Sequence, residues 1–420
     1  MRFDSSIILN KIIWGLTVIL FAFFVIFNTY SWGKYAFLFI CIAIIMFSMA
    51  ANHGKIYINI CAGHWLMLAF CAYTAITSLW AINSSDSIIM ARTLLRITIC
   101  SIMVYVHYAQ KDNVESLLKA VKWAGYVLAI YTILFYGLVN LLRASLGATY
   151  RMQQEYANQN DIGMTIAISF VLQFAELVYD KKNWWEALFL IPSIIVVAAT
   201  QSRNAFIMIV TGIVGFVAIK NWDNQKFASS FIKTLLGVAV TIAGIYLLSY
   251  LNLFTGIIER LNSMLSLITG KGEVDNSTLK RQQMMQIGIK YWSQYPILGI
   301  GMANPHIVAA YYIRDTYLHS NFIELLCGGG LMGTLLYYGM FIYIAYGLLK
   351  HQYTDRRYYS ICLAWLVVMF IMDLGTVSYY EKSRGMYLTI EFINLHCLKK
   401  AEEQQKLKAQ TDTQQDNPAL

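Results

Sequence analysis

The stretch that decides the fold is residues 12–30, IIWGLTVILFAFFVIFNTY, which carries no charged side chain. Coiled as an α-helix, it is long enough to cross the roughly 30 Å of hydrocarbon in a bilayer. Similar stretches recur along the chain, in which 58% of residues are apolar and only 13% are charged. Soluble proteins have about a quarter of their residues charged. The sequence therefore predicts an all-α, polytopic transmembrane helical bundle.

The apolar stretches number about twelve, and all but one pair are separated by short connections. The expected spans are residues 12–30, 35–52, 56–82, 87–108, 117–142, 162–179, 187–201, 204–220, 232–254, 321–349, 359–379 and 384–398. We expect spans one to nine in residues 1–254, a large loop in 255–320, spans ten to twelve in 321–398 and a polar tail in 399–420. Only that loop is long enough to fold by itself, so we seek function there.

Basic residues set the expected orientation. Lys55, Lys111 and the pair Lys181 and Lys182 lie in connections that become cytoplasmic when the N-terminus is cytoplasmic, as the positive-inside bias prefers. An even number of spans returns the C-terminus to the cytoplasm and puts the large loop outside. No small-residue cleavage site follows the first apolar run, so we expect it to remain as a span. The formal charge of +9 fits anionic lipid head groups, and we expect no nucleic-acid partner.

Several kinds of chemistry lack their usual residues. No G-x-x-x-x-G-K-[ST] phosphate loop occurs, so ATP is not expected as a direct substrate. No Asp-x-Asp pair and no cluster of His and carboxylates at ligand spacing occurs, so we expect no metal and no cofactor. No spacing of acidic residues in the loop selects the two facing carboxylates of a glycoside hydrolase. The seven cysteines fall in or beside spans, where we expect them to pack rather than form disulfides.

His319 comes at the end of the large loop, in HSNFIE at residues 319–324. There the chain re-enters the membrane as a helix that we expect to end at the flexible glycines 328–330. An imidazole with its ordinary pKa of about 6.5 is mostly neutral and can accept a proton, which suits a general base. The alternative is an interfacial histidine that caps or hydrates the helix start.

Two arginines face outward in this topology. Arg203 lies at the turn between two spans, and Arg281 lies in the helical run from Leu279 to Trp292. A guanidinium stays charged, and its planar fork of donors fits phosphate oxygens in pairs. The alternative for either residue is a loop arginine or one that snorkels to the membrane surface.

Further cations are candidate lipid or phosphate contacts. They are Arg151, Arg260 and Arg314 on the outer loops, and Arg92 and Arg96 on one face of the fourth span. A charge at the centre of a span costs roughly 2.5 to 3.5 kcal/mol on insertion scales. Arg92 and Arg96 should therefore have an anionic partner, either a lipid phosphate or Asp373 of the eleventh span.

Residues 295–305, YPILGIGMANP, hold two of the four prolines and a Gly-x-Gly. This composition predicts a tight turn whose backbone approaches another group closely. Because the turn follows no strand, we expect no dinucleotide site.

Taken together, these segments resemble the O-antigen polymerase and ligase family, membrane glycosyltransferases that act on polysaccharide intermediates carried by undecaprenyl pyrophosphate. The residues that carry the resemblance are SLWAIN at 78–83, NQND at 158–161, TQSRN at 200–204, Arg281 with Gly288 and Trp292, PILGIG at 296–301, and HSNFIE at 319–324 with Gly330 and Gly333. These motifs extend over most of the chain. Ser320 separates His319 from Asn321, whereas many relatives have the asparagine directly after the histidine.

The resemblance implies a GT-C-like bundle in a bacterial plasma membrane and gives functional roles to Arg203, Arg281 and His319. The two arginines would stabilise the pyrophosphate leaving group, and His319 would take the proton of the acceptor hydroxyl. The reaction so implied is a single, metal-independent displacement with inversion. The implied partners are undecaprenyl pyrophosphate-linked glycans and membrane lipids, with flippase and chain-length regulator proteins.

Two alternatives stay open. We prefer a polymerase, which joins repeat units on the carrier, to a ligase, which moves a finished glycan to a glycolipid, because the outer cations suit a second carrier-linked glycan. The other alternative is an exporter of polysaccharide or lipid. It would depend on polar residues within spans, namely Arg92, Arg96, Asp373 and Glu391, and would be indifferent to His319.

Overall fold

The computed structural model describes residues 5–146 except 57 and 59, residue 152, residues 157–222 except 180, a few residues between 229 and 250, and residues 255–415. Every regular element among them is a helix, which confirms the all-α prediction. The elements are α1 (Ser5–Ala22), α2 (Phe24–Thr29), α3 (Gly33–Ala51), α4 (Ala62–Ile76), η1 (Thr77–Leu79), α5 (Ser84–Gln110), α6 (Val114–Tyr136), α7 (Leu138–Leu146), α8 (Gln159–Tyr179), η2 (Lys181–Phe189), α9 (Leu190–Thr200), α10 (Arg203–Asn221), α12 (Thr255–Thr269), α13 (Asn276–Gln294), α14 (Pro305–Tyr312), α15 (Asn321–Lys350), α16 (Arg356–Met372) and α17 (Lys382–Gln415).

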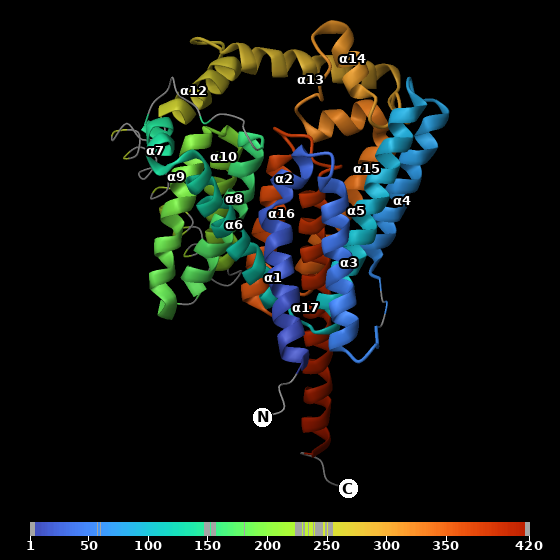
Figure 1. The fold of residues 1–420 in the computed structure, drawn as a ribbon, viewed down its shortest axis with the longest axis vertical. Coiled ribbons are helices and arrows are strands. Elements are labelled where there is room, and N and C mark those ends of the chain that lie inside the picture. The colour runs from blue at the N-terminus through green and yellow to red at the C-terminus, as the bar shows by residue number, and fades with distance from the viewer. Residues whose placement is uncertain are drawn as a thin grey trace.

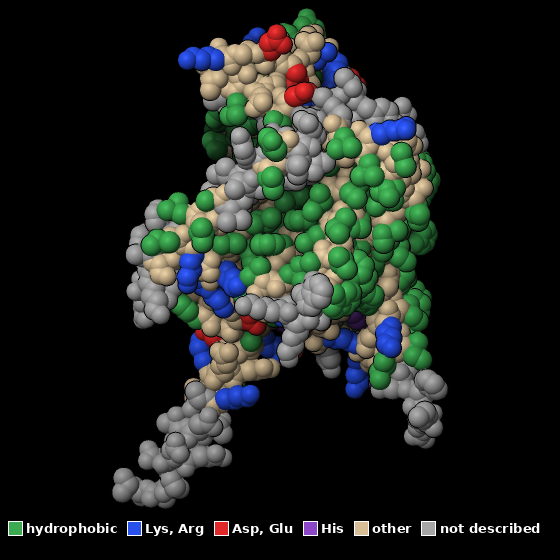
Figure 2. All heavy atoms as spheres, turned by 90° about the vertical axis from the view of Figure 1, so that its left-hand side faces the viewer, with side chains coloured by type: hydrophobic (Ala, Val, Ile, Leu, Met, Phe, Trp, Pro, Cys, Tyr) green, Lys and Arg blue, Asp and Glu red, His purple; other side chains and the backbone are tan. Residues whose placement is uncertain are grey.

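Seven of the described helices are long and apolar enough to cross a membrane. They are α3, α4 with η1, α5, α6, α8, α10 and α15, while α1 and α9 are apolar but shorter. Figure 2 shows hydrophobic side chains spread over the flank of the bundle, with charged side chains gathered toward its two ends. That surface fits a protein embedded in a bilayer. The expected span 232–254 lies mostly outside the described residues.

The last two expected spans, 359–379 and 384–398, correspond to α16 and the first part of α17. Neither is among the seven apolar helices. Both are largely buried, and α17 packs against α5, α6, α15 and α16. A helix surrounded by other helices can carry polar side chains because they face protein rather than lipid.

The segment 255–320 forms α12, α13 and α14, which cover one end of the bundle (Figure 1). α1 begins and α17 ends at the opposite end of the bundle. The cap has a small hydrophobic core, which also includes one residue of α15. The core is formed by Met284, Ile300, Val308, Ala309, Leu318 and, from α15, Cys327. The cap is therefore packed together and sits over α10, which begins at Arg203, and over the start of α15, which follows His319.

The turn at residues 295–304 packs against α15, as its glycines predicted. Gly301 donates its backbone N–H to the Gly328 carbonyl at 2.9 Å, and Leu331 donates to the Pro296 carbonyl at 2.9 Å. A Cβ on Gly299, whose φ is +68°, would lie 2.4 Å from the Gly328 carbonyl oxygen. Gly330, with φ at +60°, is non-helical, so the helix that begins at Asn321 is interrupted at the glycines as expected, and a second helical part of α15 continues to Lys350. The turn satisfies backbone groups on both sides of the kink, because its amides donate to carbonyls before Gly330 and its carbonyls accept from amides after it.

Candidate active site

Arg203 begins α10 and is fixed by the cap. Ser202 accepts a hydrogen bond from the Ala205 amide at 3.4 Å and so caps the helix. The Arg203 side chain is buried, and its Nη1 donates to Thr278 Oγ1 at 2.7 Å and to the Arg260 carbonyl at 3.1 Å. Arg203 therefore joins α10 to the first turn of α13 and to α12.

Asp275 is the carboxylate nearest to Arg203, with 3.7 Å between Oδ2 and Nη1. It caps α13 by accepting from the Thr278 amide at 2.9 Å, and Ser263 Oγ donates to it at 2.5 Å. Burial opposes ionisation, but the hydrogen bonds from Ser263 and Thr278 and the charge of Arg203 hold the pKa of Asp275 at about 2. The charge of Arg203 is thus partly neutralised by a carboxylate at every ordinary pH.

Arg281 lies one turn after Thr278 on α13 and is half-buried. Within the described part of the chain, its guanidinium makes no hydrogen bond and no ion pair. Burial lowers the pKa of Arg281, yet a guanidinium remains charged at any relevant pH. A partly desolvated cation without a partner is a position suited to an anionic ligand.

His319 sits in the left-handed backbone region, with φ at +60°. Its ring centroid lies 4.4 Å from that of Tyr317. Burial, and then the charges of Arg281 and Arg314, lower the pKa of His319 to about 4. The imidazole is therefore neutral near pH 7 and able to accept a proton.

Asn321 holds His319 in place from two residues along the chain. Its backbone N–H donates to the Asp373 carbonyl at 2.8 Å, and its Oδ1 accepts from the amides of Ser378 and Tyr379 at 2.9 and 3.0 Å. Asp373 in turn forms a fully buried ion pair with Arg384, at 2.5 Å. These contacts fasten the start of α15 to the connection between α16 and α17. The sequence did not predict the pairing of Asp373 with Arg384. The signal was two opposite charges inside neighbouring apolar spans.

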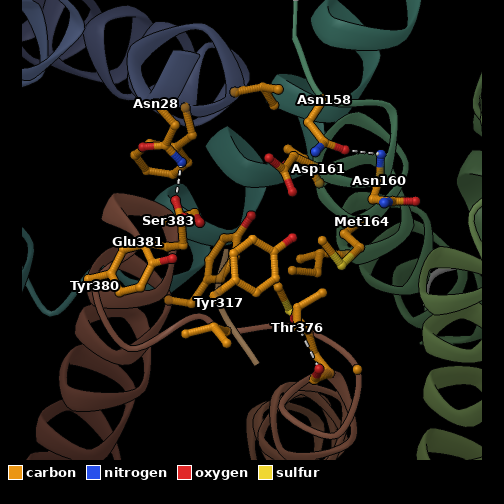
Figure 3. Close-up of a pocket in the computed structure, with 18 of the residues that line it drawn as sticks. Asn28, Asn158, Asn160, Asp161, Met164, Tyr317, Thr376, Tyr380, Glu381 and Ser383 are labelled. Carbon is orange, nitrogen blue, oxygen red and sulfur yellow. Dashed lines mark hydrogen bonds between the residues drawn. The ribbon is translucent and has the colours of Figure 1, made fainter. Parts of the chain in front are cut away.

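Two cavities meet at His319 and Arg281. The apolar cavity, of about 340 Å³, is lined by Arg203 and Thr278 together with side chains such as Ile207, Met208, Leu267, Met285 and Ile371. The polar cavity, of about 140 Å³, is shown in Figure 3 and is lined by groups such as Asn28, Asn160, Asp161, Tyr317 and Glu381. Both cavities include Arg281, His319, Met372 and Gly375 in their walls. The three residues that the sequence singled out therefore line the apolar cavity together.

The polar cavity contains carboxylates to which the sequence analysis gave no role. Asp161 comes from the first turn of α8, and Glu381 from the connection that precedes α17. Asn28 Nδ2 donates to the Glu381 carboxylate, and Asn28 Oδ1 accepts from Lys382 at 2.8 Å. Burial, and then the charge of Asp161, raise the pKa of Glu381 above its usual range. Asp161 is the last residue of the NQND motif at 158–161, and this motif could have pointed to it. No sequence motif pointed to Glu381.

The further cations divide into two groups. Arg260 belongs to the cap cluster, where its Nη1 donates to the Gln201 carbonyl at 3.4 Å, and Arg314 acts electrostatically on His319. Arg92 is exposed and Arg96 is half-buried on α5. The expected pairing of either with Asp373 is wrong, because that carboxylate is taken by Arg384. Arg151 lies outside the described residues.

Within the described ranges, no three His, Cys, Asp or Glu side chains come together in a way that could hold a metal ion. The cations at the site are arginines. The arrangement can hold an amphiphile with an anionic head in the apolar cavity and present its head to a neutral imidazole at the junction.

Comparison with known proteins gives a family model that matches part of the chain. Residues 188–338 match the family model described as O-Antigen ligase. The matched segment contains Arg203, Arg281 and His319, whereas Asp161 and Glu381 lie outside it. No curated protein matches the chain. The family and the apolar helices together indicate an enzyme of the bacterial inner membrane whose substrates are lipid-linked glycans. The match at residues 188–338 thus supports the resemblance of this chain to the O-antigen polymerase and ligase family of membrane glycosyltransferases.

Proposed function

We propose that this protein is a polysaccharide polymerase that transfers a glycan from undecaprenyl pyrophosphate to a hydroxyl group of an acceptor repeat unit on the same kind of carrier. The observation that carries the proposal is the junction of the two cavities. An apolar cavity bearing Arg203 and Arg281 meets a polar cavity at His319.

The apolar cavity suits the donor lipid. Its methionine, leucine and isoleucine side chains offer an apolar surface for the isoprenoid units nearest the head group. Arg281, which has no partner within the described residues, would bind the pyrophosphate in a paired geometry. Arg203 already donates to Thr278 through Nη1, so it would meet the pyrophosphate through its remaining donors.

The reaction follows from these positions. The acceptor oxygen attacks the anomeric carbon, forming the new glycosidic bond, while the bond from that carbon to the pyrophosphate oxygen breaks. The electron pair leaves with the pyrophosphate, whose charge the two arginines stabilise. The acceptor proton passes to His319 and then to water. One displacement of this kind inverts the configuration at the anomeric carbon.

The electrostatics of His319 fit a base that improves when the donor binds. Burial and the charges of Arg281 and Arg314 lower its pKa to about 4 in the empty site. A bound pyrophosphate would offset the two arginine charges and raise the pKa toward the value of a free imidazole. His319 would then be a stronger base in the donor complex than in the empty site.

The preference for a polymerase rests on cations beyond the proposed pair. Arg260 and Arg314 lie close enough to interact with Arg203 and His319, and a second carrier-linked glycan would bring further phosphates. A ligase is the second candidate, because the matched family model is described as O-Antigen ligase. The discriminating measurement is what accumulates in cells that lack the protein. A lost polymerase leaves single repeat units, whereas long polymer still attached to the carrier would identify a ligase.

The proposal places the cap of α12–α14 on the outer face of the membrane, with both termini in the cytoplasm. Single cysteines introduced at Lys271 and Arg356 test this orientation. A membrane-impermeant thiol reagent added to intact cells should label the first and not the second. Labelling of both from one side would mean that the number of spans between them is wrong.

The activity itself is tested with purified protein and the carrier-linked repeat unit extracted from cells that lack the protein. Longer carrier-linked products should form without added nucleotide. A purified, folded protein that yields no longer product and no transfer to a glycolipid acceptor would refute glycan transfer altogether.

A further inference from the structure

We propose that the polar cavity is the acceptor-sugar subsite, in which Asp161 and Glu381 hold hydroxyl groups of the acceptor glycan beside His319. This inference rests on the proposed function, because it assumes that glycan transfer takes place at the junction of the two cavities.

The lining of the cavity has the chemistry of sugar recognition. Asp161 and Glu381 come from different elements and approach the space from different sides, and Tyr317 lines the same space (Figure 3). Asn158 and Asn160 add amides from the start of α8, next to Asp161. Carboxylates and amides pair with hydroxyl groups, which are donors and acceptors at once, and aromatic rings pack on apolar sugar faces.

The direction of an inverting displacement assigns the acceptor to this cavity. The attacking oxygen must approach the anomeric carbon from the side opposite the leaving pyrophosphate. Arg203 lines only the apolar cavity, and Asp161 and Glu381 line only the polar one, while His319 and Arg281 belong to both. With the pyrophosphate held on the side of Arg203, the open path for the acceptor passes through the polar cavity.

The charges of the two cavities support the same assignment of pyrophosphate and acceptor. The Asp161 carboxylate repels a pyrophosphate and the Glu381 carboxyl adds no positive charge, so the polar cavity is a poor site for an anionic head group and a better one for a neutral sugar. Within the described residues, the Asp161 side chain accepts no hydrogen bond, which leaves both of its oxygens for a ligand. Glu381 is held by Asn28, which fixes its direction. The two groups thus offer one unused carboxylate and one oriented carboxyl.

The test uses purified full-length protein with two probes. The acceptor probe is the repeat-unit oligosaccharide released from the carrier, which lacks pyrophosphate and so cannot serve as donor; the donor is the intact carrier-linked unit at saturation. The second probe is undecaprenyl pyrophosphate, whose binding reports on the apolar cavity alone. The variants are Asp161→Asn and Glu381→Gln, which keep side-chain size. The matched controls are Asp315→Asn and Glu273→Gln, which are exposed on the cap.

We expect Asp161→Asn and Glu381→Gln to raise the KM for the oligosaccharide about tenfold or more, as losing a hydrogen bond to a charged group does. The affinity for undecaprenyl pyrophosphate should stay unchanged, and the controls should match the parent. An unchanged acceptor KM, weaker carrier binding, or no transfer to the oligosaccharide by a parent that extends carrier-linked units would each overturn the subsite. A parent that neither binds the carrier nor makes longer products would instead refute the proposed function.

Discussion

Arg384 is buried and Arg281 is half-buried, but only Arg384 forms an ion pair with a carboxylate. Arg384 is 1% exposed, its Nη2 lies 2.5 Å from Asp373 Oδ1, and its Nε donates to Ser378 at 3.1 Å. Arg281 has no such partner within the described residues and lines both cavities. A paired buried charge holds helices together, whereas an unpaired one next to a cavity costs stability unless a ligand completes it. We therefore expect Arg384 to stabilise the fold and Arg281 to bind the ligand.

His319 is the proposed general base, so its removal gives the largest expected effect. It is fastened to the Arg384 network through Asn321, and the charge of Arg281 acts on its ring. We expect His319→Ala to lower the rate of glycan transfer by about 10²- to 10⁴-fold, as loss of a general base does. The protein should still accumulate in the membrane, because the ring makes few structural contacts. His306→Ala on the cap is the control, and transfer by His319→Ala within a few fold of the parent would remove His319 from the mechanism.

The arginines themselves should respond in opposite ways to the same substitution. Arg384→Gln leaves Asp373 buried without its partner and should destabilise the protein by about 3 to 5 kcal/mol. Arg281→Gln should leave stability unchanged or raised, because no partner is orphaned, while transfer falls by about 10²- to 10³-fold. Thermal unfolding in detergent and the transfer assay read the two effects separately. A large loss of stability in Arg281→Gln would mean that Arg281 is structural as well.

Substitution of Arg203 or Arg281 by lysine tests whether the site needs a guanidinium or only a positive charge. We expect Arg281→Lys to transfer glycan about tenfold or more slowly than the parent, since an ammonium cannot make the paired contacts of a planar fork. Arg203→Lys should also lose its contacts to Thr278 and the Arg260 carbonyl. Transfer rates in membranes with equal amounts of each variant measure the effect. Full activity in both lysine variants would show that charge alone is sufficient.

The pH dependence of transfer tests whether the ligand neutralises Arg281. In the empty site the pKa of His319 is lowered to about 4, so the base is neutral above that pH, and kcat/KM for the donor, measured at saturating acceptor, should hold down to about pH 5. In the donor complex the arginine charges are offset, the pKa rises, and the acid limb of kcat should lie at higher pH than that of kcat/KM. Coincident acid limbs would indicate that the bound donor does not screen Arg281. The carboxyls of Asp161 and Glu381 face the same space and could also titrate. If His319 causes the separation of the two acid limbs, the variant Glu381→Gln should still show that separation.

Excess chelator should have the smallest effect, namely none. Two arginines supply the positive charge that the leaving group requires, and general acid–base help comes from His319. Transfer by protein washed with EDTA should equal that of untreated protein. An absolute requirement for a divalent cation would contradict the assignment of the leaving-group role to Arg203 and Arg281.

The fold was largely predictable where hydrophobicity alone decides it. The stretches that became α3, α5, α8, α10 and α15 are apolar, and the expected spans match their positions within a few residues. The path of the chain through the kink in α15 was not predictable, because it depends on hydrogen bonds from Leu331 to Pro296 and from Gly301 to Gly328 across the chain. Local sequence favours a helix break at three glycines, and packing against the turn sets the path of the chain across that break.

The site was predictable only in part, for a similar reason. Arg203, Arg281 and His319 lie in motifs with recognisable order, and the structure brings them to one cavity. Arg384 was not found because its partner is chosen by how α16 and α17 pack, and Asp373 was assigned to Arg92 or Arg96 instead. Asp161 and Glu381 are far apart in sequence and meet only through the arrangement of α8 and α17.

Binding of the carrier lipid tests the central claim most directly, because it isolates the unpaired arginine from catalysis. The protein in lipid nanodiscs is titrated with undecaprenyl pyrophosphate and, as the matched ligand without charge, with undecaprenol. We expect Arg281→Gln to weaken binding of the pyrophosphate about tenfold or more and to leave binding of the alcohol unchanged, while Arg92→Gln changes neither. Equal affinity of the parent and Arg281→Gln for undecaprenyl pyrophosphate would contradict the account, since Arg281 would then hold no leaving group.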